Sequence, residues 1–252
     1  MRIDGKSTRV RERIRLEIPL VIRYQETGAI SWEEATLLRD VTPFGAGFFL
    51  KRPVEPKRLV HLTMPLPRQF RFYDHGLTDY RIWAVVRYVE ANPPNPEQLT
   101  TFSIGVAFIG KETPGSYRLD PTTLYDLKPT LARGGAWMAR SQPRRTGKFK
   151  RSEEERYERA FQVIIEAFDE SGRVTACEQA ETKDVSVHGA AVLHANDVPI
   201  GRFVRLTNES FGVSILAVLR GSRISQGGQR TLHLEFIDGQ WPVETIESEG
   251  EP

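Results

Sequence analysis

Alternating arginines near the start of the chain have the spacing needed to bind an anion. Arg11 and Arg15 are four residues apart, and Arg9 and Arg13 form a second such pair. In a loop or a single turn, this spacing can place two guanidinium groups on one side. The planar guanidinium binds phosphate or a guanine edge through paired hydrogen bonds, and its face stacks on a purine. Two converging arginines would suit a planar, doubly anionic ligand, although a solvated arm paired with neighbouring glutamates remains an alternative.

A second chemical motif has the form Asp-x-Ser/Thr-x-x-Gly. In the first instance, Asp40 and Thr42 precede Gly45. An ionised aspartate only accepts hydrogen bonds, so it could receive the N1–H and the exocyclic N2–H of a guanine. The alternative is a well-made β-turn in which the side chains bond the backbone and Gly45 takes a positive φ. The same pattern at 184–189 makes chance a weaker explanation.

The repeated motif belongs to a duplication of the whole module. A shift of 144 residues aligns residues 15–63 with 159–207 without a gap. Gly28 then falls on Gly172, and the two motif turns superpose. Residues 84–87 match 217–220 only at a shift of 133, so the first copy carries an insertion within 65–80, which we interpret as a longer loop or a distorted hairpin.

Period-2 alternation of apolar residues predicts a mostly β fold in each copy. The expected strands are residues 15–24, 35–41, 46–50, 58–64, 81–90 and 102–109 in the first copy, and 159–168, 173–183, 190–194, 202–208, 212–220 and 230–237 in the second. Six short strands at this spacing predict a small antiparallel barrel in each copy. Asp120-Pro121 followed by Leu124, Leu127 and Leu131 predicts a helix after the first barrel, ending at 134–135, and we expect no equivalent after the second.

The arginine pair, the strand opening at 19–21 and the Asp-x-Ser/Thr-x-x-Gly turn together resemble the PilZ domain family. Residues 105–108, Gly-Val-Ala-Phe, are similar to the closing strand of that family. The resemblance covers residues 9–132 and 151–240. It implies tandem six-stranded antiparallel PilZ-like barrels that bind the bacterial second messenger cyclic di-GMP. In that family the arginine arm wraps the nucleotide against the barrel, and the turn reads a guanine edge.

Carried over residue by residue, the resemblance implies ligand-binding residues in both copies. In the first copy they are Arg9, Arg11, Arg15, Asp40, Thr42 and Gly45; in the second, more weakly, they are Arg156, Arg159, Asp184, Ser186 and Gly189. Thr42 keeps the hydroxyl of the usual serine but is stiffer at χ1. In the gap-free alignment Glu155 takes the place of Arg11, and a carboxylate there would repel a diphosphate. We therefore expect the first copy to bind the nucleotide and the second to be weakened or structural.

Composition sets the remaining expectations. The 252 residues carry a net charge of +2 and contain one cysteine, which excludes an internal disulfide. The five histidines show no metal-ligand spacing, so we expect neither an enzyme nor a metal or other cofactor. The sequence offers no membrane span and an N-terminus too polar for a secretion signal, so we expect a cytoplasmic protein. The expected domains are 1–134, a basic linker 135–152, and 153–252 with an acidic tail.

Three functions fit these expectations. The first is a cyclic di-GMP receptor that relays a conformational change to an unidentified effector protein, with homo-oligomerisation left open. The second keeps the fold as a protein-interaction scaffold whose nucleotide motifs have decayed. The third uses the acid-free segment 131–151 to contact nucleic acid, but no base-reading motif accompanies its basic residues, so a flexible linker is the better interpretation.

Overall fold

The computed structural model describes residues 13–92, 99–128, 137–142, 154–194, 203–224 and 229–248. The chain divides into two compact units. The first contains Met1–Phe49, Lys57–Arg87 and Ile104–Gln142, and the second contains Leu50–Pro56, Tyr88–Ser103 and Pro143–Pro252.

The first copy forms a closed antiparallel barrel, as its strand pattern predicts. Its strands are β1 (Ile14–Arg15), β2 (Pro19–Gln25), β3 (Ser31–Thr42), β4 (Gly45–Leu50), β5 (Leu59–Met64), β6 (Tyr80–Ala91) and β7 (Phe102–Gly110). The order is β1-β3-β2-β5-β6-β7-β4, and β4 also pairs with β3, which closes six strands and leaves β1 attached to β3. In β2, Leu20, Ile22 and Tyr24 alternate with exposed residues and are at most 2% exposed, so they form part of the core.

A helix follows this barrel, but at a different position from the predicted one. The short helix α1 spans Gly115–Leu119, and residues 125–128 form strand β8 (Tyr125–Lys128), which pairs with β9 (Met138–Ser141) inside the range expected as linker. The prediction of a helix starting at Asp120 is therefore wrong. The Asp120 carboxylate accepts hydrogen bonds from the backbone and hydroxyl of Thr122, and such local bonds favour a turn over a helix. Tyr125 then packs against Leu59 and Val85 as a strand residue.

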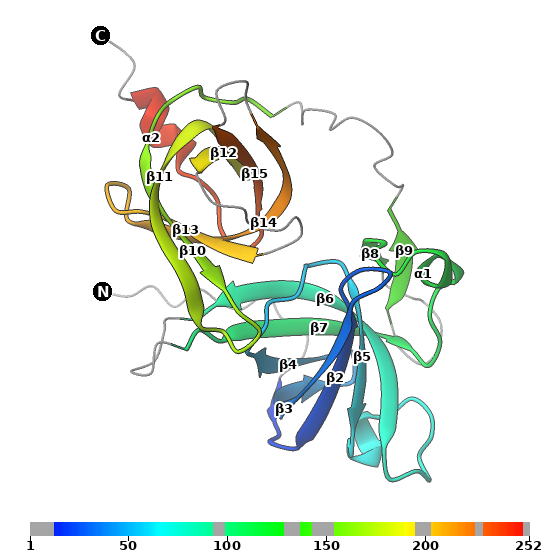
Figure 1. The fold of residues 1–252 in the computed structure, drawn as a ribbon. Coiled ribbons are helices and arrows are strands. Elements are labelled where there is room, and N and C mark those ends of the chain that lie inside the picture. Colours follow the sequence, from blue (N-terminus) through cyan, green and yellow to red (C-terminus); the bar gives the residue numbers. More distant parts are fainter. Residues whose placement is uncertain are drawn as a thin grey trace. The chain divides into compact units, whose positions relative to one another are not determined.

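The second copy also forms a closed barrel, visible in Figure 1 as the ring from β10 to β15. Its strands are β10 (Gln162–Phe168), β11 (Val174–Ser186), β12 (Gly189–His194), β13 (Phe203–Asn208), β14 (Val213–Ile224) and β15 (Arg230–Phe236). Contrary to expectation, a helix follows this barrel too. It is α2 (Val243–Ser248), and Trp241 and Ile246 bury their side chains in the barrel core. Apolar burial of these two residues explains why the segment folds onto the barrel.

The strand registers correct the gap-free alignment of the two copies. In the first hairpin Ile22 lies opposite Glu34, and in the second Ile165 lies opposite Glu178. The shift is thus 165 − 22 = 143 before the hairpin tip and 178 − 34 = 144 after it. The extra residue is absorbed by a β-bulge, because the β10–β11 register shifts between Ala167 and Phe168 and leaves Thr175 without a partner in the register. Residues before the bulge therefore correspond at a shift of 143.

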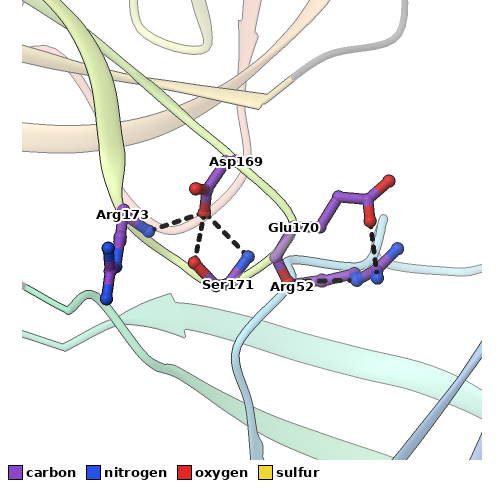
Figure 2. Close-up of polar contacts among 5 residues, drawn as sticks. All are labelled: Arg52, Asp169, Glu170, Ser171 and Arg173. Carbon is purple, nitrogen blue, oxygen red and sulfur yellow. Dashed lines mark hydrogen bonds and ion pairs between the residues drawn. The ribbon is translucent and has the colours of Figure 1, made fainter.

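Two segments of the first copy, Leu50–Pro56 and Tyr88–Ser103, belong to the second compact unit. The segment Leu50–Pro56 contacts the tip of the β10–β11 hairpin, Asp169–Arg173. Arg52 donates to the backbone oxygen of Glu170 at 3.1 Å, and its Nη2 is 3.0 Å from the Glu170 carboxylate, as Figure 2 shows. This ion pair is mostly exposed on the glutamate side, so its geometry contributes more to position than to stability.

The second segment is held by backbone contacts with the same tip. Thr100 donates its amide to the Gly172 oxygen at 2.7 Å, and the Thr100 hydroxyl accepts a hydrogen bond from the buried Arg205. Gly172 has φ +78°, and a Cβ there would lie 2.1 Å from the Thr100 oxygen. The fit therefore requires glycine for two reasons, its left-handed backbone and its lack of a side chain.

The hairpin tip is also ordered internally. One carboxylate oxygen of Asp169 accepts hydrogen bonds from the amide and hydroxyl of Ser171 and from the amide of Arg173 (Figure 2). Desolvation opposes ionisation of Asp169, but these hydrogen bonds outweigh it and hold the pKa of Asp169 below its usual value. The tip is thus a hydrogen-bonded turn that keeps Gly172 in position.

Candidate functional site

Strand β1 carries the arginine arm to the Asp40 turn in the first copy. Arg15 lies opposite Asp40 in the β1–β3 register, and its side chain is exposed. Opposed residues on neighbouring strands have Cβ atoms about 5 Å apart, so both side chains can meet one ligand. The predicted residues Arg15, Asp40, Thr42 and Gly45 are therefore brought together. Arg9 and Arg11 lie outside the described residues.

Arg13 is a member of this cluster that the predicted site did not include. Its Nη1 lies 3.1 Å from Oδ1 of Asp40, and both side chains remain partly exposed, at 33% and 23%. Such an ion pair is worth at most about 1 kcal/mol, so a ligand can rearrange it. The signal was present in the sequence, because Arg13 and Arg15 are two residues apart and side chains at that spacing share one face of an extended chain.

The hydroxyl of Thr42 is used within the turn. It accepts a hydrogen bond from the Phe44 amide at 3.1 Å and lies 3.4 Å from the Gly45 oxygen. The turn between β3 and β4 is thus preformed, which lowers the entropy cost of presenting Asp40 to a ligand. Both interpretations of the motif, a well-made turn and a binding turn, are compatible with this geometry.

Gly45 is needed for close packing rather than for a positive φ, which corrects the prediction. A Cβ at Gly45 would lie 2.2 Å from the backbone oxygen of Val106 in β7, and Gly45 is not among the described residues with positive φ. Gly189 in the second copy has the same role, with a distance of 2.6 Å to the oxygen of Leu234. The motif glycine therefore lets the closing strand of each barrel approach the turn.

The sequence analysis also missed Gly47, whose position makes room for the Asp40 carboxylate. A Cβ at Gly47 would lie 2.7 Å from Oδ2 of Asp40. The residue opposite Asp184 in the second barrel is Ala191, so that space is filled by a methyl group there. The aligned Gly47–Ala191 difference was the available signal.

The turn of the second copy has a similar strand pairing, but a side chain of the protein itself contacts it. Arg156 pairs with Asp184, as Arg13 pairs with Asp40. The Ser186 hydroxyl donates to the Glu154 carboxylate at 3.1 Å and is 3.3 Å from the Gly189 oxygen. The other oxygen of Glu154 lies 2.6 Å from Nδ1 of His188. The second turn is therefore covered by an acidic side chain from its own arm.

The arm register explains this difference. Tyr157 bridges Val185, whereas Ile14 pairs with Val41, so the shift in the arm is 157 − 14 = 143. Arg156 is then the counterpart of Arg13. By the same shift, the acid two residues earlier, Glu154, replaces Arg11, and Glu158 replaces Arg15.

The earlier alignment of Arg15 with Arg159 and of Arg11 with Glu155 is corrected accordingly. The backbone oxygen of Arg159 accepts a hydrogen bond from Thr182, which anchors the start of the strand. A contact between Arg159 and a nucleotide stays a prediction.

Other features of the described residues do not point to a second chemistry. No group of three or more histidines, cysteines, aspartates or glutamates among them could hold a metal ion. None of the helices in the described part of the chain has the length and apolar character to cross a membrane. A shallow hollow on the outer face of the first barrel is lined by Val21, Arg23, Glu33, His61, Thr63 and Arg81, none of which is a predicted site residue.

Comparisons with known proteins give similarity at the level of solved structures only. No protein-family model matches the chain, and no curated protein matches it in sequence. The Bacillus subtilis inhibitor of motility MotI/DgrA is 11% identical, with 93% of each chain covered and a TM-score of 0.30. The PlzA protein of Borreliella burgdorferi in complex with c-di-GMP is 9% identical, with 94% of this chain and 91% of that chain covered and a TM-score of 0.28. YcgR from Escherichia coli in complex with c-di-GMP is 12% identical, with coverages of 92% and 80% and a TM-score of 0.24.

Proposed function

We propose that the chain is a tandem PilZ-type receptor that binds cyclic di-GMP at the turn of the first barrel and has no enzymatic activity. The observation that carries the proposal is the difference between the arms. The first arm presents exposed Arg15 opposite Asp40, whereas the second arm covers its own turn with Glu154. The first turn thus combines an exposed cationic group, Arg15, with a partly exposed carboxylate, Asp40, for a guanine nucleotide.

The chemistry of the first turn matches the ligand group by group. The guanidinium of Arg15 can bind a phosphate or stack on a purine, and the sequence just upstream contains two further arginines, Arg9 and Arg11. Asp40 has more acceptor positions than its single ion pair with Arg13 uses, so it can receive the N1–H and N2–H of guanine. An adenine offers neither donor on that edge, which predicts selectivity against cyclic di-AMP.

A relay to an effector is part of the proposal. Strand β4 begins at Gly45 in the turn and ends at Leu50, where the chain enters the segment Leu50–Pro56 of the second unit. That segment is fastened by Arg52 to Glu170 and by Glu55 to Arg220, whose charges are 2.5 Å apart. A conformational change at the turn can therefore reach the second unit along the single short strand β4. The effector protein that reads it is unidentified, and we place both in the cytoplasm.

Titration calorimetry of the full chain with cyclic di-GMP tests the binding site. We expect heat of binding from the parent protein and a loss of about tenfold or more in affinity for Arg15→Ala, because a charge-assisted hydrogen bond contributes about 1.5–3 kcal/mol. Arg118→Ala, at an exposed position of helix α1 that is not a predicted site residue, is the control and should bind like the parent. Cyclic di-AMP should give no heat at the same concentration.

The scaffold interpretation predicts a different result. If the parent releases no heat and gains no thermal stability from cyclic di-GMP, the nucleotide site has decayed, since a ligand that binds only the native state must stabilise it. In that case Arg15→Ala and the parent would behave alike.

A further inference from the structure

The insertion of the first copy forms an ordered loop beside the candidate site. The loop joins β5 to β6 and contains the short 3-10 helix η1 (Arg68–Phe70). At its centre, Arg71 is 8% exposed and donates hydrogen bonds to four backbone oxygens, those of Leu66, Asp74, Leu77 and Thr78, at 2.5 to 3.0 Å. A single guanidinium thus satisfies the carbonyl groups that a long loop would otherwise leave open, and it fixes the loop shape.

This fixed loop places Phe72 against the motif turn. The ring of Phe72 lies 6.4 Å from the ring of Phe44, centroid to centroid, with a tilt of 41°. Phe44 lies in the turn between Thr42 and Gly45, and its backbone oxygen accepts a hydrogen bond from Phe108. Both phenylalanines remain partly exposed, so the pair offers aromatic surface at the turn that follows Asp40.

The second copy lacks both halves of this pair. Only four residues separate β13, which ends at Asn208, from β14, which starts at Val213. The counterpart of Phe44 is His188, which is bound by Glu154. The aromatic pair therefore occurs in the copy whose turn is open and not in the copy whose turn is covered.

We propose that Phe44 and Phe72 form an aromatic wall on which one guanine base of the nucleotide stacks while Asp40 binds its edge. The inference rests on the proposed function and deepens it, because it assigns a ligand-binding role to the inserted loop. An aromatic ring offers any base a stacking surface, and Asp40 would then add the selectivity for guanine. A ligand-binding role of the wall also explains why Arg71 fixes the shape of an insertion that has no counterpart in the second barrel.

The test compares Phe72→Leu with Phe72→Tyr in the full chain, by titration with cyclic di-GMP. Leucine keeps apolar packing against Phe44 but removes the aromatic face, so we expect an affinity about tenfold lower. Tyrosine keeps the face and should bind within about threefold of the parent. Thermal unfolding of both variants shows whether the fold is intact.

Ring-current shifts provide a second measurement that a purely structural role of Phe72 would not change. The guanine H8 resonance of the bound nucleotide should move upfield in the parent and in Phe72→Tyr, and this shift should be reduced in Phe72→Leu. If the parent binds and Phe72→Leu binds equally well with the same H8 shift, the aromatic wall is overturned while the proposed site stands. If the parent gives no heat at all, both proposals fail together.

Discussion

The two motif turns have the same strand register but differ in the charge of the side chains that the arms bring to them. In each, an arginine from the arm pairs with the motif aspartate, and the motif glycine lies against a carbonyl of the closing strand. The arms differ two residues upstream of that arginine, where the first copy has Arg11 and the second has Glu154. We propose that the same turn forms a ligand site in the first copy, whereas in the second copy it makes an internal contact with Glu154. The fold of the module does not determine which of the two it becomes.

The hairpins at the other end of β3 and β11 differ as well. The tip of the second hairpin holds Arg52 and Thr100 through Glu170 and Gly172. Gly28, in the tip of the first hairpin, has nothing within 4 Å of an added Cβ. The first hairpin is held by Arg58, which donates to the backbone oxygens of Gln25 and Glu26, but it has no close packing at its glycine, unlike the second hairpin. This contrast supports our view of the second copy as a supporting module.

Gly172→Ala should have the largest effect of the substitutions that separate the copies. The left-handed backbone and the 2.1 Å approach to the Thr100 oxygen both oppose a methyl group. We expect the free energy of unfolding to fall by about 3 kcal/mol, measured by urea denaturation.

Gly28→Ala, at the glycine in the tip of the first hairpin, is the control for this change. With open space around it and no positive φ, it should alter stability by no more than about 0.5 kcal/mol. Equal losses in the two variants would show that the hairpin tips do not differ as described.

Glu154→Ala should have an intermediate effect and tests what covers the second turn. It removes the carboxylate from Ser186 and His188, which costs roughly 1 kcal/mol of stability because the contacts are partly exposed. We expect calorimetry to show additional, weaker binding of cyclic di-GMP once the acid is gone. Glu155→Ala, an exposed neighbour, should leave the titration unchanged. A second binding event in both variants, or in neither, would contradict a specific role for Glu154.

The smallest effect concerns His233, which stands in the second closing strand where the first has Gly105. Burial lowers the pKa of His233 below 6.5, and the charges of Arg223, Arg156 and Lys183 add to this, while Asp184 opposes it. Because the unfolded chain then binds the proton more readily, stability should fall as the pH drops below about 6.5. His233→Gln should flatten this part of the stability profile, measured by urea denaturation between pH 7.5 and 5.5. If stability falls with pH in the variant as steeply as in the parent, His233 is not the cause of this pH dependence.

The barrels and their turns could be predicted because strand alternation and turn residues are local properties. The helix placed after Asp120 was wrong because its leucine spacing fits a helix, whereas the burial of Tyr125 against Leu59 depends on residues far away in sequence. The reason why position 45 requires glycine could not be predicted from the sequence either. Its constraint is the carbonyl of Val106, and a glycine required by packing cannot be distinguished by sequence from one required by φ.

The candidate site was predicted in part. The sequence identified Asp40 and Arg15 but misaligned the second arm by one residue, because the bulge at Thr175 has no sequence signature. The same error hid the role of Glu154. The contact between Phe44 and Phe72 joins a turn to an insertion, and neither segment alone indicates it.

The one-residue bulge has a practical consequence for anyone who exchanges parts between the two modules. An arm from the first copy grafted onto the second must be joined at a shift of 143 anywhere before Thr175, and at 144 after it. A junction placed one residue off would reverse the inward and outward faces of β10 and expose Val163 and Ile165 to water. The residue shift between the two copies thus changes by one at the hairpin. Any natural recombination between the halves of the gene would have to preserve this change in shift.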